Sequence, residues 1–494
     1  MIMNNFDSFL EKIKFANVIP VIETLPADLL TPLSVYLKLS HGQSDSFLLE
    51  SVEGGESLAR YSFIGANPKM IVSGSDEQIN IRDSEGETAR QISIFDYLRE
   101  HFANNKVLED AAMPSFIGGA IGSLGFSCSS WFEPTLKNTK GANDGEASFM
   151  FFRSLVAFDH AKQVIKIVSL VFTEETEGKS DRLKQLYRDA VTENIRIKTI
   201  LENNPVVLPK ANNPIENADV TSNWKQADFE SAVLEVKEMI SAGECYQVVL
   251  SQCFTKPTSA SAVSIYRAMR SLNPSPYMFL LHIGNRSIIG ASPEMLVKCT
   301  GDKLDYRPIA GTRPRGKTPD EDTLLADEMQ ADKKEVSEHL MLVDLGRNDL
   351  GRVAEYGSIA VKDLMSVEKY SHVQHLVTYL SGTLREGRDR FDALASCFPA
   401  GTVSGAPKVR AIEIIQKLEP TPRGIYAGAV GYFDYAGNMD TCITIRTLIL
   451  ENGVAKIQAG AGIVADSVPE LEYQETINKA KMLLKAVEIA EGRG

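Results

Sequence analysis

The sequence predicts an α+β protein with large, mostly antiparallel β-sheets flanked by helices. Short alternating apolar runs between turns, as over 47–51 and 164–172, are typical of strands. Segments with apolar residues at helical spacing, as over 227–242, predict amphipathic helices. Because both signals occur along the chain, we expect sheets and helices to pack together.

The individual elements follow in order from these signals. Helices are predicted over 180–202 and over 227–242, and the second ends at Gly243. Four short strands are predicted next, over 246–254, 277–282, 287–290 and 303–309. A long acidic helix is predicted over 320–345, and a C-terminal helix begins after Pro469 and ends near Ala490.

The length of 494 residues suggests two or three domains. The best linker candidate is 203–223, which contains three prolines and six asparagines. We therefore predict an N-terminal domain over 1–210 and a C-terminal domain over 224–492.

The composition, with 44% hydrophobic and 24% charged residues, is that of a soluble globular enzyme. A formal net charge of -13 disfavours nucleic acid as a partner. Six cysteines without a CxxC pair predict reduced thiols in a cytoplasmic protein. We expect neither a signal peptide nor a membrane partner, because no run approaches the roughly 18 apolar residues of a membrane span.

Four glycine-containing strings in the last third of the chain point to an enzyme site. They occupy 308–312, 401–408, 440–446 and 458–462. Each sets glycine or a small hydroxyl residue beside a residue that can bind an anion. Because glycine lets backbone N–H groups approach a ligand closely, the strings predict a site for a small, multiply charged acid.

One string overlaps a literal match to the phosphate-loop pattern GxxxxGK[ST], over 311–318. A nucleotide hydrolase or switch is therefore the main alternative from another class of protein. However, Pro314 removes a backbone donor from such a loop, and Pro319 stands where its helix should already have begun. The acidic residues 320–322 would also repel the phosphates, so the alternative is disfavoured.

Glu338 and Glu475 stand on apolar faces of two predicted helices. A carboxylate is costly to bury unless it is paired or coordinates a metal. Mg²⁺ typically takes one or two protein carboxylates and completes its shell with water and substrate oxygens. Surface ion pairs with Lys334 and Lys479, each four residues away, are the alternative interpretation.

The segment 338–349, together with the four strings, resembles the chorismate-utilising enzymes. Segments 48–51, 60–65 and 273–279 narrow the resemblance to the large subunit, component I, of anthranilate synthases. It covers nearly the whole chain and is most specific from Trp224 onward. One departure is that Ser123 and Leu124 stand where the family usually carries aromatic residues, which concerns N-terminal packing more than chemistry.

The resemblance implies a fold and a reaction. The fold has two large, mostly antiparallel sheets flanked by helices, with an N-terminal regulatory and a C-terminal catalytic part. In the reaction, which begins tryptophan biosynthesis, ammonia adds to chorismate as the ring hydroxyl leaves, and loss of pyruvate then gives anthranilate. Mg²⁺ is the implied cofactor, held by Glu338 and Glu475 and acting as a Lewis acid.

The resemblance also assigns roles to other residues. The implied catalytic residues are Glu294, as general acid for the leaving hydroxyl, and His375 and Thr402. The implied substrate-binding residues are Gly311, Thr312, Tyr426, Arg446, Gly460, Ala461 and Gly462. Arg446 and Tyr426 would hold the enolpyruvyl carboxylate. Ser51, Pro276, Tyr277 and Met278 resemble the elements that bind tryptophan in the family. Without the family resemblance, each of these residues could instead have a purely structural role, at a strand end, in a turn or as a side chain whose hydrogen bonds are made within the fold.

Two positions favour anthranilate over the products of sister enzymes. Gln247 stands where isochorismate-forming relatives carry a lysine that activates water. Ala310 stands where aminodeoxychorismate synthases often carry a nucleophilic lysine, so ammonia itself is the expected amine.

The chain shows no glutaminase signature, so we expect a separate glutamine amidotransferase subunit, component II, to deliver the ammonia. L-Tryptophan is expected as a feedback inhibitor. A binding-only sensor of tryptophan or chorismate is the alternative, but every position that the chemistry needs carries a competent residue.

Overall fold

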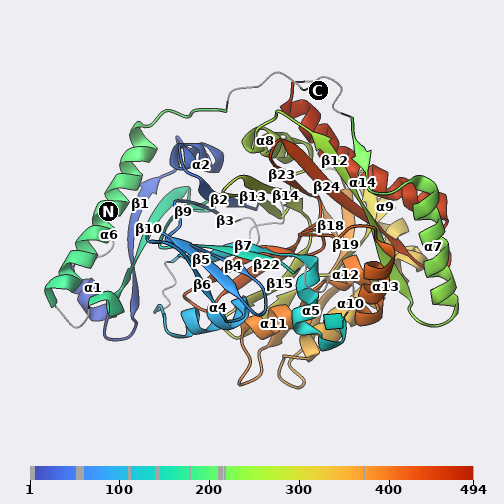
Figure 1. Ribbon diagram of the computed structural model, residues 1–494, viewed down its shortest axis with the longest axis horizontal. Coiled ribbons are helices and arrows are strands. Elements are labelled where there is room, and N and C mark those ends of the chain that lie inside the picture. The colour runs from blue at the N-terminus through green and yellow to red at the C-terminus, as the bar shows by residue number, and fades with distance from the viewer. Residues whose placement is uncertain are drawn as a thin grey trace.

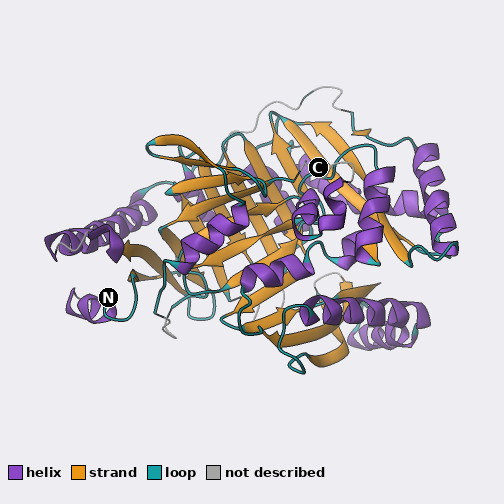
Figure 2. Cartoon of the chain, turned by 60° about the horizontal axis from the view of Figure 1, so that its bottom comes forward, coloured by secondary structure: helices purple, strands orange, loops and turns teal. Residues whose placement is uncertain are grey.

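The computed structural model describes residues 6–51, 60–108, 113–138, 145–176, 180–209, 215, 219–370 and 373–492. Two 12-stranded sheets dominate it, and every pair of neighbouring strands described in them is antiparallel. Helices lie against the sheets on their outer sides (Figures 1 and 2). The predicted α+β class with two large antiparallel sheets is confirmed.

The first sheet joins a block of N-terminal strands to a block of C-terminal strands, and the two blocks meet where β2 pairs with β13. Its strands run in the spatial order β1 (Val18–Pro26), β10 (Val164–Phe172), β9 (Ser154–Asp159), β3 (Tyr61–Ala66), β2 (Asp45–Glu50), β13 (Tyr277–Ile283), β14 (Arg286–Ser292), β23 (Thr447–Glu451), β24 (Val454–Ile463), β12 (Gln247–Pro257) and β11 (Thr221–Ser222), and β20 (Gly405–Ala406) also pairs with β12.

The second sheet is built in the same mixed way. Its order is β17 (Ile309–Pro314), β19 (Val373–Thr383), β16 (Lys303–Tyr306), β15 (Met295–Thr300), β22 (Met439–Ile443), β21 (Ala429–Asp434), β7 (Gly119–Leu124), β8 (Ala147–Phe152), β4 (Met70–Gly74), β5 (Ile79–Asp83) and β6 (Gly86–Arg90), and β18 (Ala360–Lys369) pairs with β19. Both sheets therefore contain strands from before and after the predicted linker. The assignment of regulation to 1–210 and catalysis to 224–492 stays a prediction, and residues 210–214 and 216–218 of the linker lie outside the described residues.

The described helices cover these sheets and close their ends. They are α1 (Phe6–Lys12), α2 (Pro32–Ser40), α4 (Ile94–Ala103), α5 (Ser129–Phe132), α6 (Ser180–Asn203), α7 (Gln226–Ser241), α8 (Ala262–Leu272), α9 (Pro319–Ala331), α10 (Lys333–Gly351), α11 (Arg390–Cys397), α12 (Gly401–Ser404), α13 (Lys408–Leu418) and α14 (Pro469–Ala490). In Figure 1, α6 lies along β1 and β10 at one end, while α8 and α14 lie against the other half of the first sheet. None of the helices in the described ranges is long and apolar enough to cross a membrane.

Strand alternation divides the interior into two layers. Phe47 of β2 packs in the cluster between the sheets, and its neighbour Leu48 packs in the cluster beneath α8 and α14. Leu281 and Leu280 of β13 repeat this division. A period of two places successive side chains on opposite faces, so both faces of the first sheet are buried.

Two predicted elements differ from the structure. The helix predicted over 320–345 is two helices, because Asp332 adopts an extended conformation and its side chain accepts the N–H groups of Lys334 and Glu335, which caps α10. The strand predicted over 303–309 is also two strands, β16 and β17, with Arg307 and Pro308 between them. Proline cannot donate to a sheet ladder, which is consistent with the interruption there.

Candidate active site

Glu294 lies between β14 and β15, where the chain passes from the first sheet to the second. The residue is 7% exposed, and burial raises the pKa of its carboxyl to about 7. Its backbone is fixed because the Ile443 N–H donates to the Glu294 carbonyl at 3.0 Å. A carboxyl with this pKa is partly protonated near neutral pH and can serve as a general acid.

Thr402, in α12, faces the Glu294 carboxyl. Its hydroxyl lowers the pKa of Glu294, against the larger effect of burial, without reaching full hydrogen-bond geometry. Among the described residues Thr402 Oγ1 has no hydrogen-bond partner, although it is buried. Buried hydroxyls are normally paired, so this one is available to a bound molecule. The structure therefore brings two of the predicted catalytic residues together.

His375, in β19, is held by the predicted substrate-binding residues Gly311 and Thr312. Its Nδ1 lies 2.7 Å from the Gly311 carbonyl oxygen and 3.2 Å from Thr312 Oγ1. A carbonyl can only accept, so Nδ1 carries the proton and Nε2 of the neutral ring is the free acceptor. Burial lowers the pKa of His375, which favours this neutral form.

Arg446 follows β22 and has a positive φ of 50°. Burial lowers the pKa of its guanidinium, and no carboxylate of the described residues opposes that effect. The Ala291 N–H donates to the Arg446 carbonyl at 3.1 Å, three residues before Glu294. A half-buried arginine without an acidic partner is suited to bind an anionic ligand.

Tyr426 connects Arg446 with the glycines of β24. Burial raises the pKa of the Tyr426 phenol to about 12, while the nearby charge of Arg446 lowers it. The Tyr426 hydroxyl lies so close to Gly460 that a Cβ there would be 2.7 Å from it. Gly462 is similarly close to Gln247, whose Nε2 would lie 2.8 Å from an added Cβ. Only glycine leaves this room, and Ala461 between the two is fully buried.

Glu338 on α10 and Glu475 on α14 lie close enough for their charges to interact. Burial raises the pKa of Glu338, and the negative charge of Glu475 contributes in the same direction. Both side chains keep access to solvent, and Glu338 is desolvated only in part, so the expectation that they lie buried on apolar faces is wrong. The Glu475–Lys479 ion pair of the alternative interpretation does form, at 2.6 Å, and Lys479 also donates to the Gly460 carbonyl at 2.9 Å.

These two carboxylates fit a Mg²⁺ ion that is completed by substrate and water. Partial desolvation is the main cause of the raised pKa of Glu338, and repulsion from Glu335 and Glu475 adds to it; a cation would relieve that repulsion. Within the described ranges no cluster of three or more His, Cys, Asp or Glu side chains is arranged to hold a metal. The sequence predicts two protein ligands, Glu338 and Glu475, and the Mg²⁺ ion stays a prediction.

The phosphate-loop match is occupied by its own acidic residues. The Gly316 N–H donates to Asp322 at 2.6 Å and the Lys317 N–H donates to Glu321 at 2.7 Å. Arg315 also donates to both carboxylate oxygens of Asp322. The donors that a phosphate would need are thus already used, which agrees with the sequence argument against nucleotide binding.

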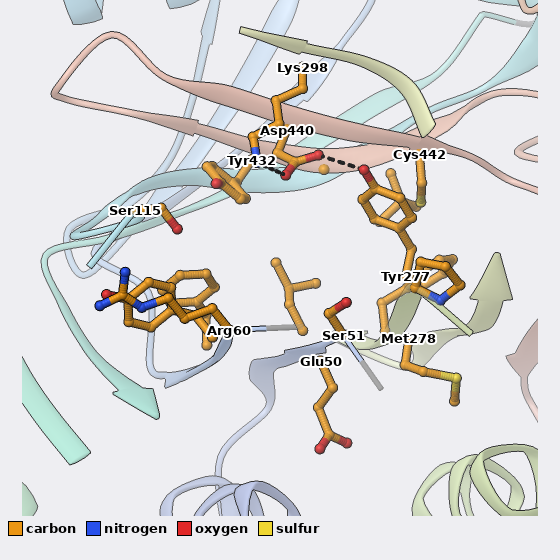
Figure 3. A pocket seen from close by; sticks show the side chains of 17 residues that line it. Glu50, Ser51, Arg60, Ser115, Tyr277, Met278, Lys298, Tyr432, Asp440 and Cys442 are labelled. Atoms are coloured by element: carbon orange, nitrogen blue, oxygen red, sulfur yellow. Dashed lines mark hydrogen bonds and ion pairs between the residues drawn. The ribbon is translucent and has the colours of Figure 1, made fainter. Parts of the chain in front are cut away.

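The four predicted tryptophan-binding residues, Ser51, Pro276, Tyr277 and Met278, all line one cavity between the two sheets (Figure 3). Figure 3 shows the side chains of Glu50 and Met278 directed away from this cavity. Met278 therefore contributes its backbone to the wall. The cavity is separate from the Glu294 site, but β15, which follows Glu294, and β22, which precedes Arg446, contribute to its wall.

Polar groups of both signs surround the cavity. Tyr277 OH donates to Asp440 at 3.0 Å, and Lys298 Nζ lies 3.4 Å from the same carboxylate. Arg60 lines the opposite side (Figure 3). Ser51 Oγ is buried and has no hydrogen-bond partner among the described residues. A mostly apolar cavity with a few charged groups of both signs and a buried hydroxyl is suited to bind a small polar ligand.

The sequence reasoning did not single out Arg60, Lys298 or Asp440 as lining this cavity. Arg60 and Asp440 stand within segments that were noted for other reasons, the first for the resemblance and the second for its string. Lys298 lies in an ordinary strand pattern, so no signal in the sequence could have indicated it.

Comparison with known proteins agrees with the family resemblance over nearly the whole chain. Residues 44–485 match the family described as chorismate binding enzyme. Anthranilate synthase component 1 of Acetivibrio thermocellus is 45% identical over 483 residues, which cover 96% of each chain. The crystal structure of anthranilate synthase component I from Streptococcus pneumoniae superposes with a TM-score of 0.73, at 34% identity, over 93% of this chain and 99% of that one.

The chain belongs to the chorismate-binding enzymes. Within them it is a relative of anthranilate synthase component 1, as the resemblance implied. The menaquinone-specific isochorismate synthase of Escherichia coli shares the fold, with a TM-score of 0.69 at 19% identity, covering 97% of this chain and 98% of that one. As in the sequence prediction, this chorismate-binding enzyme carries Gln247 beside Gly462 and a buried Ala310, and neither can act as a lysine would.

Proposed function

We propose that the chain converts chorismate and ammonia into anthranilate and pyruvate at the Glu294 site. The observation that carries the proposal is the presence in one site of a buried carboxyl of raised pKa, Glu294, and of Arg446, which has no acidic partner among the described residues. The first supplies a proton and the second receives a carboxylate. The identity to component 1 enzymes supports the same reaction.

Each group of the substrate then has a counterpart. The enolpyruvyl carboxylate binds Arg446 and the Tyr426 hydroxyl, and the glycines of β24 give the ring room. Glu294 donates its proton to the departing ring hydroxyl while ammonia attacks the ring. His375 Nε2, which is unprotonated, and the unpaired Thr402 hydroxyl serve the later loss of pyruvate.

Glu338 and Glu475 would hold the Mg²⁺ ion beside the ring carboxylate. When bound, the ion supplies a Lewis acid that screens the carboxylate and assists departure of the hydroxyl. Lys479 must release Glu475 for this, and its second contact with the Gly460 carbonyl gives it another partner at the site.

The cavity between the sheets is proposed to bind L-tryptophan as a feedback inhibitor. Asp440 offers a carboxylate to an ammonium group, Arg60 and Lys298 offer positive charge to a carboxylate, and Ser51 Oγ is an unused hydrogen-bonding group. Apolar side chains such as Phe63 and Leu49 complete the wall for an aromatic ring.

Ammonia is proposed to come from a separate glutamine amidotransferase subunit. The test compares nitrogen sources with the purified chain, chorismate and Mg²⁺. Ammonium salts should support anthranilate formation, at a rate that rises with the concentration of free NH₃, whereas glutamine should not. Glutamine-dependent turnover by the chain alone would contradict the need for a partner.

A further inference from the structure

A buried polar cluster lies directly behind His375 and takes no part in the chemistry proposed above. At its centre is Arg307, whose side chain is 2% exposed. Arg307 Nη2 donates to the Glu368 carboxylate and, at 2.8 Å, to the Tyr370 hydroxyl. The Tyr370 hydroxyl donates in turn to Glu368 at 3.1 Å. Tyr379 OH donates to the other Glu368 oxygen at 2.8 Å, so this carboxylate is fully used.

The cluster contacts the imidazole on two sides. Glu368 of β18 is the cross-strand partner of His375 of β19. The Tyr370 ring packs edge-on against the imidazole, with ring centroids 5.5 Å apart and an angle of 65° between the planes. Opposite these contacts, Nδ1 donates to the Gly311 carbonyl. The ring is therefore held at one nitrogen and along one edge.

A buried arginine is costly unless its charge is paired and its donors are used. In this cluster Glu368 pairs the charge of Arg307 and Tyr370 accepts from it, while Arg307 Nε has no hydrogen-bond partner among the described residues. Tyr370 is also tied through its backbone, because Arg315 Nη1 donates to the Tyr370 carbonyl at 2.5 Å. Tyr370 is thus held at its hydroxyl and at its backbone carbonyl. Among the described aromatic rings, its side chain packs only against the imidazole of His375.

We propose that Tyr370, anchored by Arg307 and Glu368, is a positioning residue that fixes the plane of the His375 ring and hence the direction of Nε2. The inference rests on the proposed function, in which Nε2 takes a proton during pyruvate loss. In that step the C–H bond at the aminated ring carbon breaks and its electron pair becomes a ring double bond. The ring C–O bond to the enolpyruvyl group breaks, and enolpyruvate leaves and takes up a proton to become pyruvate.

If the imidazole turns, the second step slows while the first, which uses Glu294, continues. The test is Tyr370→Phe, with Tyr379→Phe as the matched control. Tyr379→Phe removes a hydroxyl from the same carboxylate, but among the described ring contacts it is Tyr370, not Tyr379, that packs against His375. Both variants are supplied with chorismate, ammonium and Mg²⁺, and products are separated by liquid chromatography with mass spectrometry.

We expect Tyr370→Phe to lower kcat for anthranilate about tenfold, with the KM for chorismate within about twofold. The aminated compound that retains its enolpyruvyl group should appear among the products. Tyr379→Phe should stay within about twofold of the wild type and release no such compound. A purely structural role would lower all products together.

The proposal fails if Tyr370→Phe matches Tyr379→Phe and both release only anthranilate. If Tyr370→Phe does not fold, as judged by its melting temperature, Glu368→Gln takes its place, because it keeps the shape of the anchor and weakens it. Absence of the aminated compound from a Glu368→Gln variant that melts normally and turns over more slowly overturns the proposal equally. A wild-type chain that forms no anthranilate would instead refute the proposed function, and this inference with it.

Discussion

Tyr277 of β13 is the cross-strand partner of Ser292 of β14, and Glu294 follows Ser292 by two residues. The Ser292 hydroxyl donates to the Ile443 carbonyl at 2.6 Å, three residues before Arg446. The wall of the cavity between the sheets is therefore continuous with the backbone that carries Glu294 and Arg446. A ligand that displaces Tyr277 has a short path along which to act on both groups.

The first prediction concerns that path. L-Tryptophan should inhibit the enzyme, and Ser51→Phe should raise the inhibitory concentration at least about tenfold, which corresponds to about 1.4 kcal/mol of binding free energy. The phenyl ring would take the place of the Ser51 hydroxyl and extend into the cavity that Ser51 lines. The measurement is the initial rate of anthranilate formation against tryptophan concentration. Unchanged inhibition in Ser51→Phe, with normal activity in the absence of tryptophan, would contradict the assignment of the cavity.

A second prediction concerns the proton donor. Glu294→Gln keeps the size of the side chain but removes its ionisable proton, so kcat should fall by roughly 10²- to 10⁴-fold. The KM for chorismate should change little, because binding depends on Arg446 and Tyr426. Steady-state kinetics on wild type and variant measure both values. A variant that retains more than a tenth of the wild-type kcat would show that another group supplies the proton.

The same substitution should stabilise the folded chain at alkaline pH. Burial raises the pKa of Glu294 from 4.5 to about 7, so the protonated carboxyl is the form that the fold favours. The stabilisation that the protonated Glu294 carboxyl gives to the folded state is fully present below pH 4.5, and it is lost as the pH rises through about 7. At pH 8 the wild type therefore bears the cost of a buried carboxylate, of the order of 3 kcal/mol.

Denaturant unfolding at two pH values tests this directly. Glu294→Gln should be more stable than the wild type at pH 8, and the difference should shrink towards pH 4.5. Equal stability at both pH values would mean that Glu294 is not buried as a neutral acid. Lower activity together with higher stability in Glu294→Gln is the result expected when a side chain serves catalysis at the expense of stability.

A fourth prediction concerns the metal. Mn²⁺, followed by its electron paramagnetic resonance signal, should bind the wild type and bind Glu338→Gln at least about tenfold more weakly. Binding should weaken as the pH falls, because Glu338, whose pKa is raised, takes up a proton in place of the metal. Glu488→Gln, further along α14, is the control and should bind like the wild type. Equal affinity in Glu338→Gln and Glu488→Gln would place the metal elsewhere.

The sequence was informative where a local pattern has one physical meaning. The strands over 164–172 and 277–282 and the helices over 180–202 and 227–242 all form close to their predicted bounds. Periodicity could not show that Asp332 divides one helix into two, because a capping aspartate and a surface aspartate look alike in an acidic segment. Nor could it show that each sheet joins a block of N-terminal strands to a block of C-terminal strands, since pairing between distant segments leaves no local signal.

The site was predicted from resemblance more than from physics. Structure then supplied what no pattern contains: the burial that raises the pKa of Glu294, the unpaired Thr402 hydroxyl and the carbonyl that fixes the His375 tautomer. For Glu338 and Glu475 the physical argument from the sequence was wrong, because both are exposed. The packing of α10 and α14 nevertheless brings the two carboxylates close enough for their charges to interact. This proximity, rather than burial, supports the metal prediction.

The most direct measurement of the central claim is the product that the purified chain forms from chorismate, ammonium and Mg²⁺ in mildly alkaline buffer. Fluorescence and mass spectrometry identify that product. The account predicts anthranilate, formed with one equivalent of pyruvate and abolished by EDTA. Isochorismate or aminodeoxychorismate as the product, or chorismate that binds and remains unchanged, would contradict it.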